Sequence, residues 1–135
     1  MPGHSRRLVT VACCLPPVYA ILHGRAALAH IEDVVLEVKQ RFRDPFIIVA
    51  GDFNQWAVLE ALEDFPDLKE APVGVTRKDK CIDRMFTSFG RSIKEAGTLP
   101  PLESREGRAR CPSDHRIAYL RVELHTLEMG VRAHI

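Results

Sequence analysis

The sequence predicts an α/β fold in which strands and helices alternate and stack in layers. Apolar runs rich in β-branched residues occur at 7–14 and 46–50. Between these runs, residues 25–42 place apolar side chains at helical spacing. Further strand-like segments follow from residue 81 onwards. An alternation of strands and helices that ends in several strands is typical of layered α/β domains rather than of helical bundles or barrels.

The composition is that of one ordinary globular domain covering residues 1–135. The chain has 46% hydrophobic and 27% charged residues, and it is long enough to bury a core. Its formal net charge of +1 means that any nucleic-acid contact must come from a local basic patch. No apolar run is long enough to cross a membrane, so no membrane partner is expected. The four cysteines form no Cys-x-x-Cys pair, which argues against a zinc site and favours reduced thiols in an intracellular setting, cytoplasmic or nuclear.

The first strand is expected at residues 7–14, where the run RLVTVACC stops before Pro16 and Pro17. Arg6 and Arg7 in front of an apolar run also fit the start of a signal peptide. The two prolines interrupt that run, and a strand explains it better.

The next two elements are a helix and a buried strand. The helix at 25–42 is amphipathic, because charged residues fall between its apolar positions. These apolar positions are Ile31, Val34, Val35, Val38 and Phe42. Asp44 and Pro45 close the connection that follows. Residues 46–50, FIIVA, are apolar without alternation, as in a strand that is buried on both faces.

The second half is expected to contain one more helix and three strands, joined by loops. The expected segments are a helix at 55–64, a loop at 65–80, strands at 81–88, 91–97 and 116–124, a loop at 100–113, and a weakly structured tail at 125–135.

Polar residues follow the buried strand directly, in the sequence GDFN at 51–54. Ligands of layered α/β proteins bind beyond the ends of strands. Gly51 lets the backbone bend or come close to a ligand. Asp52 can take a proton or help to hold a metal, and Asn54 can orient a water or a phosphate oxygen. Turn formation is the alternative role of these residues.

Two further polar groups strengthen a catalytic interpretation. Asp83 lies in an otherwise apolar strand, and a buried acid needs a partner. Asp114 and His115 come just before the last strand. Acids that bind a divalent cation and activate water, with an amide and a histidine for phosphate oxygens, are what metal-assisted phosphoester hydrolysis requires. A structural acid paired with Arg84 or His115, and a core histidine, remain the alternatives.

The ordered motifs resemble the endonuclease/exonuclease/phosphatase superfamily. They are GDFN at 51–54, IDRMF at 82–86 and SDHRIAYLRV at 113–122. Within that superfamily the chain is most similar to the endonuclease domains of non-LTR retrotransposons and to the apurinic-site endonucleases. The resemblance runs from about residue 8 to about residue 124. It implies half of a four-layered α/β sandwich, with a mixed sheet and helices packed on one face.

The resemblance implies a role for each motif residue. Asp52 matches the acid that orients or deprotonates the attacking water, and Asn54 matches the amide that contacts the scissile phosphate. His115 matches the histidine that binds a phosphate oxygen, and Asp83 matches the acid that orients its ring. Asp114 matches the acid at the metal site, where the family binds Mg²⁺ or Mn²⁺.

The chain also departs from the family. The family domain is about twice as long and has two packed halves, so we expect a truncated domain equivalent to the C-terminal half. Cys14 stands where the family has a tyrosine, and too few residues precede Leu8 to supply the family's N-terminal Asn and metal-binding Glu. We therefore expect a weakly held metal, and weak or no activity alone. We also expect an exposed sheet face that a homo-oligomer or another partner covers.

Basic loops on either side of the motifs suggest contact with nucleic acid, DNA in particular. The predicted contact residues are Arg105, Arg108, Arg110 and Arg116, and a second cluster is formed by Arg77, Lys78 and Lys80. Solvated loops are the alternative. Two other functions remain open: a non-catalytic half-domain that oligomerises or binds a partner, and a phosphatase of a small phosphoester.

Overall fold

The computed structural model describes residues 6–54, 67–100, 114–123 and 127–128. Its elements, in chain order, are β1 (Arg6–Cys14), α1 (Pro17–Arg41), β2 (Phe46–Asp52), β3 (Lys69–Glu70), β4 (Asp83–Thr87), the 3₁₀ helix η1 (Gly90–Ser92), β5 (Ile93–Leu99), β6 (Ile117–Val122) and β7 (Leu127–Glu128). These elements confirm the predicted α/β class.

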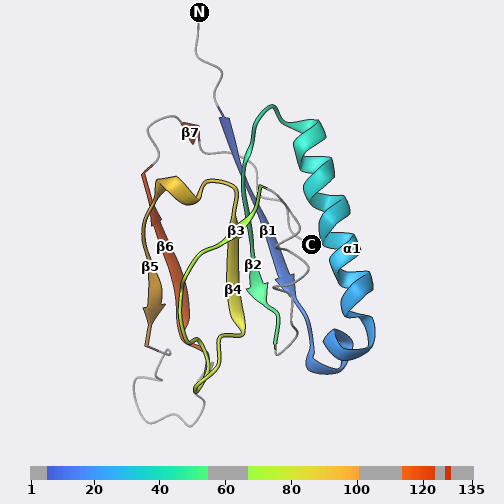
Figure 1. Ribbon diagram of the computed structural model, residues 1–135, viewed down its shortest axis with the longest axis vertical. Coiled ribbons are helices and arrows are strands. Elements are labelled where there is room, and N and C mark those ends of the chain that lie inside the picture. Colours follow the sequence, from blue (N-terminus) through green and yellow to red (C-terminus); the bar gives the residue numbers. More distant parts are fainter. Residues whose placement is uncertain (1–5, 55–66, 101–113, 124–126, 129–135) are drawn as a thin grey trace, which may run out of the picture.

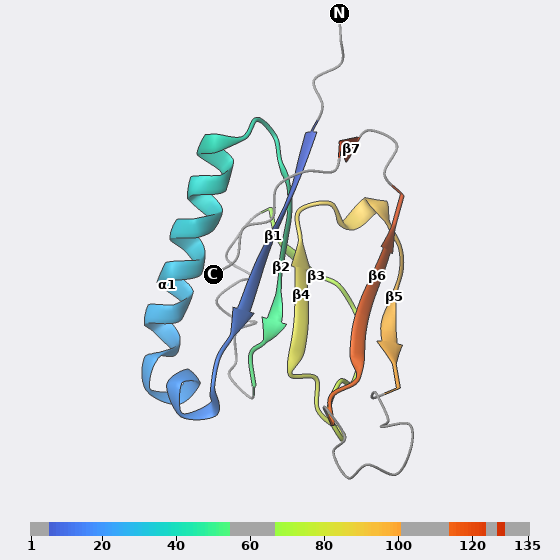
Figure 2. The ribbon, with the colours of Figure 1, turned by 180° about the vertical axis from the view of Figure 1, so that it is seen from behind.

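The main sheet is mixed and has the strand order β3-β4-β2-β1-β7, while β5 and β6 form a separate antiparallel pair. Helix α1 connects β1 to the parallel neighbour β2, which is the usual way to join parallel strands. Strand β4 then runs antiparallel to β2. Helix α1 and the β5–β6 pair lie on opposite sides of the main sheet (Figure 1), and the view from behind agrees (Figure 2).

The hydrophobic core lies between the main sheet and α1. Alternate residues of the central strands point towards the helix. Helical residues that are three or four positions apart pack against them. The strand side chains are Val9, Val11, Ile47, Val49 and Phe86, and the helical side chains are Ala27, Ile31, Val35 and Val38, all of them buried. The predicted amphipathic helix is therefore confirmed, with Val34 and Phe42 packed against the edge of the core.

The opposite face of the main sheet carries the even-numbered residues of β1 and β2. Because Val11 and Val49 face α1, Ala12, Cys14 and Asp52 point the other way. Ala12 and Cys14 are exposed. In the antiparallel register Asp52 stands opposite Asp83, so both acids belong to this face.

Helix α1 begins at Pro17, eight residues earlier than the sequence predicted from residue 25. Proline suits the first turn of a helix, since its fixed φ is helical and its missing N–H would have no partner there. The prolines that stop β1 therefore also start α1. A kink at His23 separates this first part from the predicted span.

The remaining predicted strands are found with shifted ends. The expected strands at 81–88, 91–97 and 116–124 correspond to β4, β5 and β6. Two short strands were not predicted: β3 in the expected loop 65–80, and β7 in the expected tail. The expected helix at 55–64 and nearly all of the loop at 100–113 lie outside the described residues. Among the described residues, no helix combines the length and apolar character needed to cross a membrane.

Candidate functional site

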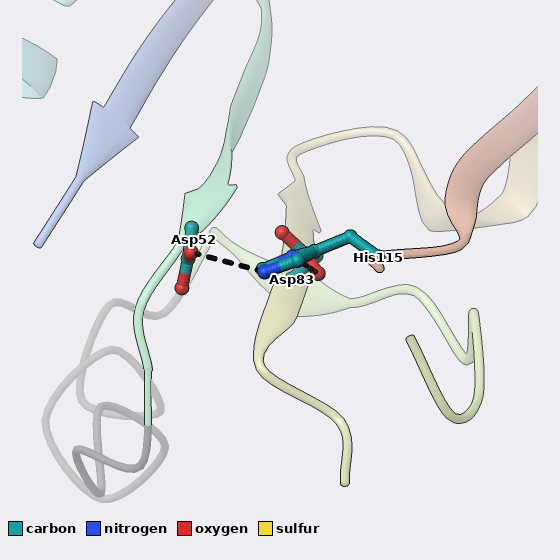
Figure 3. Close-up of side chains that lie close together, drawn as sticks. All are labelled: Asp52, Asp83 and His115. Atoms are coloured by element: carbon teal, nitrogen blue, oxygen red, sulfur yellow. Dashed lines mark hydrogen bonds and ion pairs between the residues drawn. The ribbon is translucent and has the colours of Figure 1, made fainter. Parts of the chain in front are cut away.

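Three chain segments meet at one end of the main sheet. Asp52 is the last residue of β2, Asp83 is the first residue of β4, and His115 lies just before β6. Figure 3 shows the imidazole of His115 reaching towards both carboxylates. The structure thus brings together three of the predicted site residues, which are up to 63 positions apart by their numbers in the sequence (115 − 52).

The ring of His115 is oriented by Asp83. Its Nδ1 lies 2.7 Å from Asp83 Oδ2, and the two side chains are 25% and 22% exposed. A carboxylate oxygen accepts, so the Nδ1–H group donates the hydrogen bond to Asp83. This hydrogen bond directs Nε2 towards Asp52 Oδ2 at 3.9 Å and Asp114 Oδ1 at 3.8 Å. The structural pairing of Asp83 with His115 is therefore present, and it also aims the imidazole at the other acids.

Thr76 holds the backbone of Asp83 in place, and the sequence analysis did not identify it. Its fully buried hydroxyl accepts hydrogen bonds from the backbone N–H groups of Ile82 and Asp83, at 3.1 and 3.0 Å. The backbone N–H of Arg116 donates to the Thr76 carbonyl. One residue therefore anchors the strand that carries Asp83 and the segment that carries His115. The one signal for this role in the sequence is that Thr76 is a small hydroxyl residue within a highly charged loop.

Asp52 and Asn54 form the turn that was the alternative to a catalytic role. The Asn54 backbone N–H donates to Asp52 Oδ1 at 2.8 Å, and Asn54 adopts a left-handed φ of 52° that asparagine tolerates. The Asn54 side-chain amide donates to the Leu15 carbonyl, and Leu15 N–H donates to the Asp52 carbonyl at 2.8 Å. This turn holds Asp52 Oδ1, so Oδ2 is the oxygen that faces His115.

Gly51 permits a close approach, but to the neighbouring strand rather than to a ligand. A Cβ atom at Gly51 would lie 1.7 Å from the carbonyl oxygen of Cys13. Glycine is therefore required at position 51 by the close pairing of β1 with β2, and this pairing also positions Asp52.

Asp114 lies at the exposed rim and is paired with Arg77. Arg77 Nε donates to Asp114 Oδ2 at 2.8 Å, with side chains 44% and 56% exposed. The hydrogen bond from Arg77 and its positive charge lower the pKa of Asp114, and the same contact raises the pKa of Arg77. Asp114 is therefore ionised at neutral pH. Sequence analysis placed Arg77 in a basic cluster but did not connect it to this acid.

The donor atoms fit a divalent cation. Asp52, Asp83 and His115 each place one potential ligand atom within 4.8 Å of the others, and Asp114 Oδ1 adds an oxygen beside His115. Carboxylate oxygens suit Mg²⁺ and Mn²⁺, and an imidazole nitrogen favours Mn²⁺ over Mg²⁺. Because Asp83 already accepts a hydrogen bond from the ring, Asp114 is the acid that would hold the cation, next to His115.

Of the predicted nucleic-acid contacts, Arg116 is described and exposed next to His115, while Arg105, Arg108 and Arg110 lie outside the described residues. The second basic cluster, on the turn before β4, is exposed as well.

Comparisons with family models, with curated proteins and with solved structures find no match for this chain.

Proposed function

We propose that this chain is a phosphodiesterase domain of the endonuclease/exonuclease/phosphatase type that hydrolyses nucleic acid, only weakly when alone, with the help of a weakly held Mg²⁺ or Mn²⁺. The observation that carries the proposal is the orientation of His115. Asp83 fixes one ring nitrogen, and the other faces Asp52 and Asp114 at 3.9 and 3.8 Å. If the acids only formed turns and the histidine only filled the core, nothing would require Nε2 of His115 to face these two carboxylates. We propose further that the main sheet, with α1 on one face, corresponds to half of that family's four-layered sandwich.

Each residue then has a defined task. Asp83 accepts a hydrogen bond from Nδ1–H and so orients the ring. In its doubly protonated form, His115 then presents Nε2–H to a phosphate oxygen and stabilises the charge that grows there. Asp52 Oδ1 is occupied by the Asn54 backbone N–H, which leaves Oδ2 to orient water and accept its proton. When bound near Asp114, the cation would neutralise charge on the phosphate.

The substrate class follows from the charge around the site. Arg116 and the basic turn before β4 are exposed, whereas the chain as a whole is nearly neutral. A local cluster of cations favours a polyanionic backbone over a small phosphoester, since several contacts act at once. DNA is the proposed substrate, and the predicted contacts Arg105, Arg108 and Arg110 precede the motif SDHRIAYLRV in the sequence.

Nicking of supercoiled plasmid in Mg²⁺ or Mn²⁺ tests this function. Wild type should nick in a metal-dependent manner, and Asp52→Ala and His115→Ala should each lose roughly 10²-fold or more, the usual size of a positioned acid or base. Asp33→Asn is the control, because Asp33 is an exposed acid on α1. Equal rates for all proteins, or no nicking by folded wild type with either metal, would overturn the proposal.

We also propose that a second copy covers the part of the sheet face opposite α1 that the β5–β6 pair leaves exposed. Ala12 and Cys14 are exposed on this face, and Ile48 and Met85 are only partly buried. Light scattering should show self-association, and a clean monomer at high concentration would contradict it. A folded, self-associating protein without nicking activity would instead support the alternative of a non-catalytic oligomerising or binding module.

A further inference from the structure

The ion pair between Arg77 and Asp114 places a fixed cation beside the proposed metal site. Arg77 Nε lies 2.8 Å from Asp114 Oδ2, and Asp114 Oδ1 lies 3.8 Å from His115 Nε2. The guanidinium is therefore bound to the carboxylate that would hold a divalent cation.

The backbone that carries Arg77 is held by a tight turn. Arg77 and Lys80 form an isolated antiparallel bridge, with N–H to carbonyl hydrogen bonds of 3.0 and 2.8 Å in the two directions. The adjacent Thr76 is fully buried and bonded to Ile82 and Asp83. Because this backbone is fixed to the strand that carries Asp83, only the side chain of Arg77 has to move to release Asp114.

We infer that Arg77 is the built-in cation of this site, which competes with the divalent metal for Asp114 and thereby sets the metal affinity. This inference rests on the proposed function. A metal ion at Asp114 must displace the guanidinium or accept its repulsion at short range, and either effect weakens binding. Mg²⁺ is disfavoured most, since it gives up its own water ligands reluctantly.

Direct measurement of Mn²⁺ binding, by the electron paramagnetic resonance signal of free Mn²⁺, tests the inference without requiring catalysis. Arg77→Met and Lys78→Met form a matched pair. Both remove one positive charge from the same turn, and Lys78 is exposed there. Arg77→Met should bind Mn²⁺ about two- to fivefold more tightly than wild type, the range that an exposed ion pair supports. Lys78→Met should change the affinity less, because Arg77 rather than Lys78 forms the ion pair with Asp114, and the exposed charge of Lys78 is screened by salt.

Asp114→Asn separates the two proposals. If wild type binds Mn²⁺ and Asp114→Asn weakens binding, but Arg77→Met and Lys78→Met behave alike, the competition is wrong while the proposed function stands. Weaker binding by Arg77→Met than by wild type also overturns the inference, since Arg77 would then support the site. If Asp114→Asn leaves the Mn²⁺ affinity unchanged, the cation binds elsewhere, and the inference about Arg77 is overturned as well. No binding by any folded variant overturns both the inference and the metal-dependent function.

Discussion

His115 Nδ1 and Asp83 Oδ2 lie 2.7 Å apart although the residues are separated by 32 positions in the sequence. This contact joins the segment before β6 to the first residue of β4, and it fixes the ring that faces Asp52. Orientation of an imidazole by a buried or half-buried carboxylate is how histidine is held in one tautomer at many catalytic sites.

Asp83→Asn should therefore act through His115. The amide can keep the hydrogen bond only weakly or with the wrong tautomer, so the nicking rate should fall roughly 10²-fold or more. The double variant Asp83→Asn with His115→Ala should lose little more than His115→Ala alone, because the two residues work as one unit. Initial rates of the three variants measure this, and losses that multiply would show independent roles.

Thr76→Val should destabilise the protein because it removes the acceptor of two backbone N–H groups. The buried amides of Ile82 and Asp83 would lose their partner, at a cost of about 1–3 kcal/mol in the free energy of unfolding. Thr87→Val is the matched control: Thr87 is equally buried, but its hydroxyl has no hydrogen-bond partner among the described residues. Urea titration should find this control neutral or stabilised, and equal losses for both variants would contradict the anchoring role of Thr76.

Gly51→Ala should separate β1 from β2. Its Cβ would meet the Cys13 carbonyl oxygen at 1.7 Å, and this neighbour is backbone that cannot rotate away. We expect a loss of about 3 kcal/mol or more, at or above the upper end for overpacking. Gly90→Ala is the control, because nothing lies within 4 Å of a Cβ built there. Thermal unfolding that treats the two variants alike would argue against the close strand pairing.

The adjacent thiols should differ in reactivity. Burial and the neighbouring Cys14 raise the pKa of Cys13 to about 11, so almost none of it is thiolate at neutral pH, whereas Cys14 is exposed. Burial also raises the pKa of Cys81. Because the thiolate is the nucleophile, iodoacetamide should modify Cys14 before Cys13 and Cys81 in the folded protein. Peptide mass spectrometry follows the order, with urea-unfolded protein as the control. Faster modification of Cys13 in the folded state would refute its burial.

The sequence predicted the elements that local pattern determines. The apolar runs located β1 and β2, and helical spacing located the core face of α1. The start of α1 was missed because Pro16 and Pro17 were interpreted only as a stop, although Pro17 also fits a helix start. Strands β3 and β7 are two residues each, and pairing with longer strands, rather than their own composition, defines them.

The candidate site likewise contains residues that the sequence predicted and residues that only the structure identified. Asp52, Asp83 and His115 were found because their types and order carry chemical meaning, and the register of β2 with β4 brings the two acids face to face. Thr76 and Arg77 were not assigned to the site, since their contacts depend on the turn before β4 and not on any local pattern. The periodic spacing of apolar residues does not predict contacts that a turn brings about.

Cleavage of a DNA duplex in ¹⁸O-labelled water, with Mn²⁺ and product analysis by mass spectrometry, tests the central claim most directly. If Asp52 directs water onto phosphorus beside His115, the terminal phosphate of the product gains ¹⁸O, and Asp52→Ala abolishes this product while Asp33→Asn does not. Product phosphates without the label, or labelled product formed equally by Asp52→Ala, would contradict hydrolysis at this site.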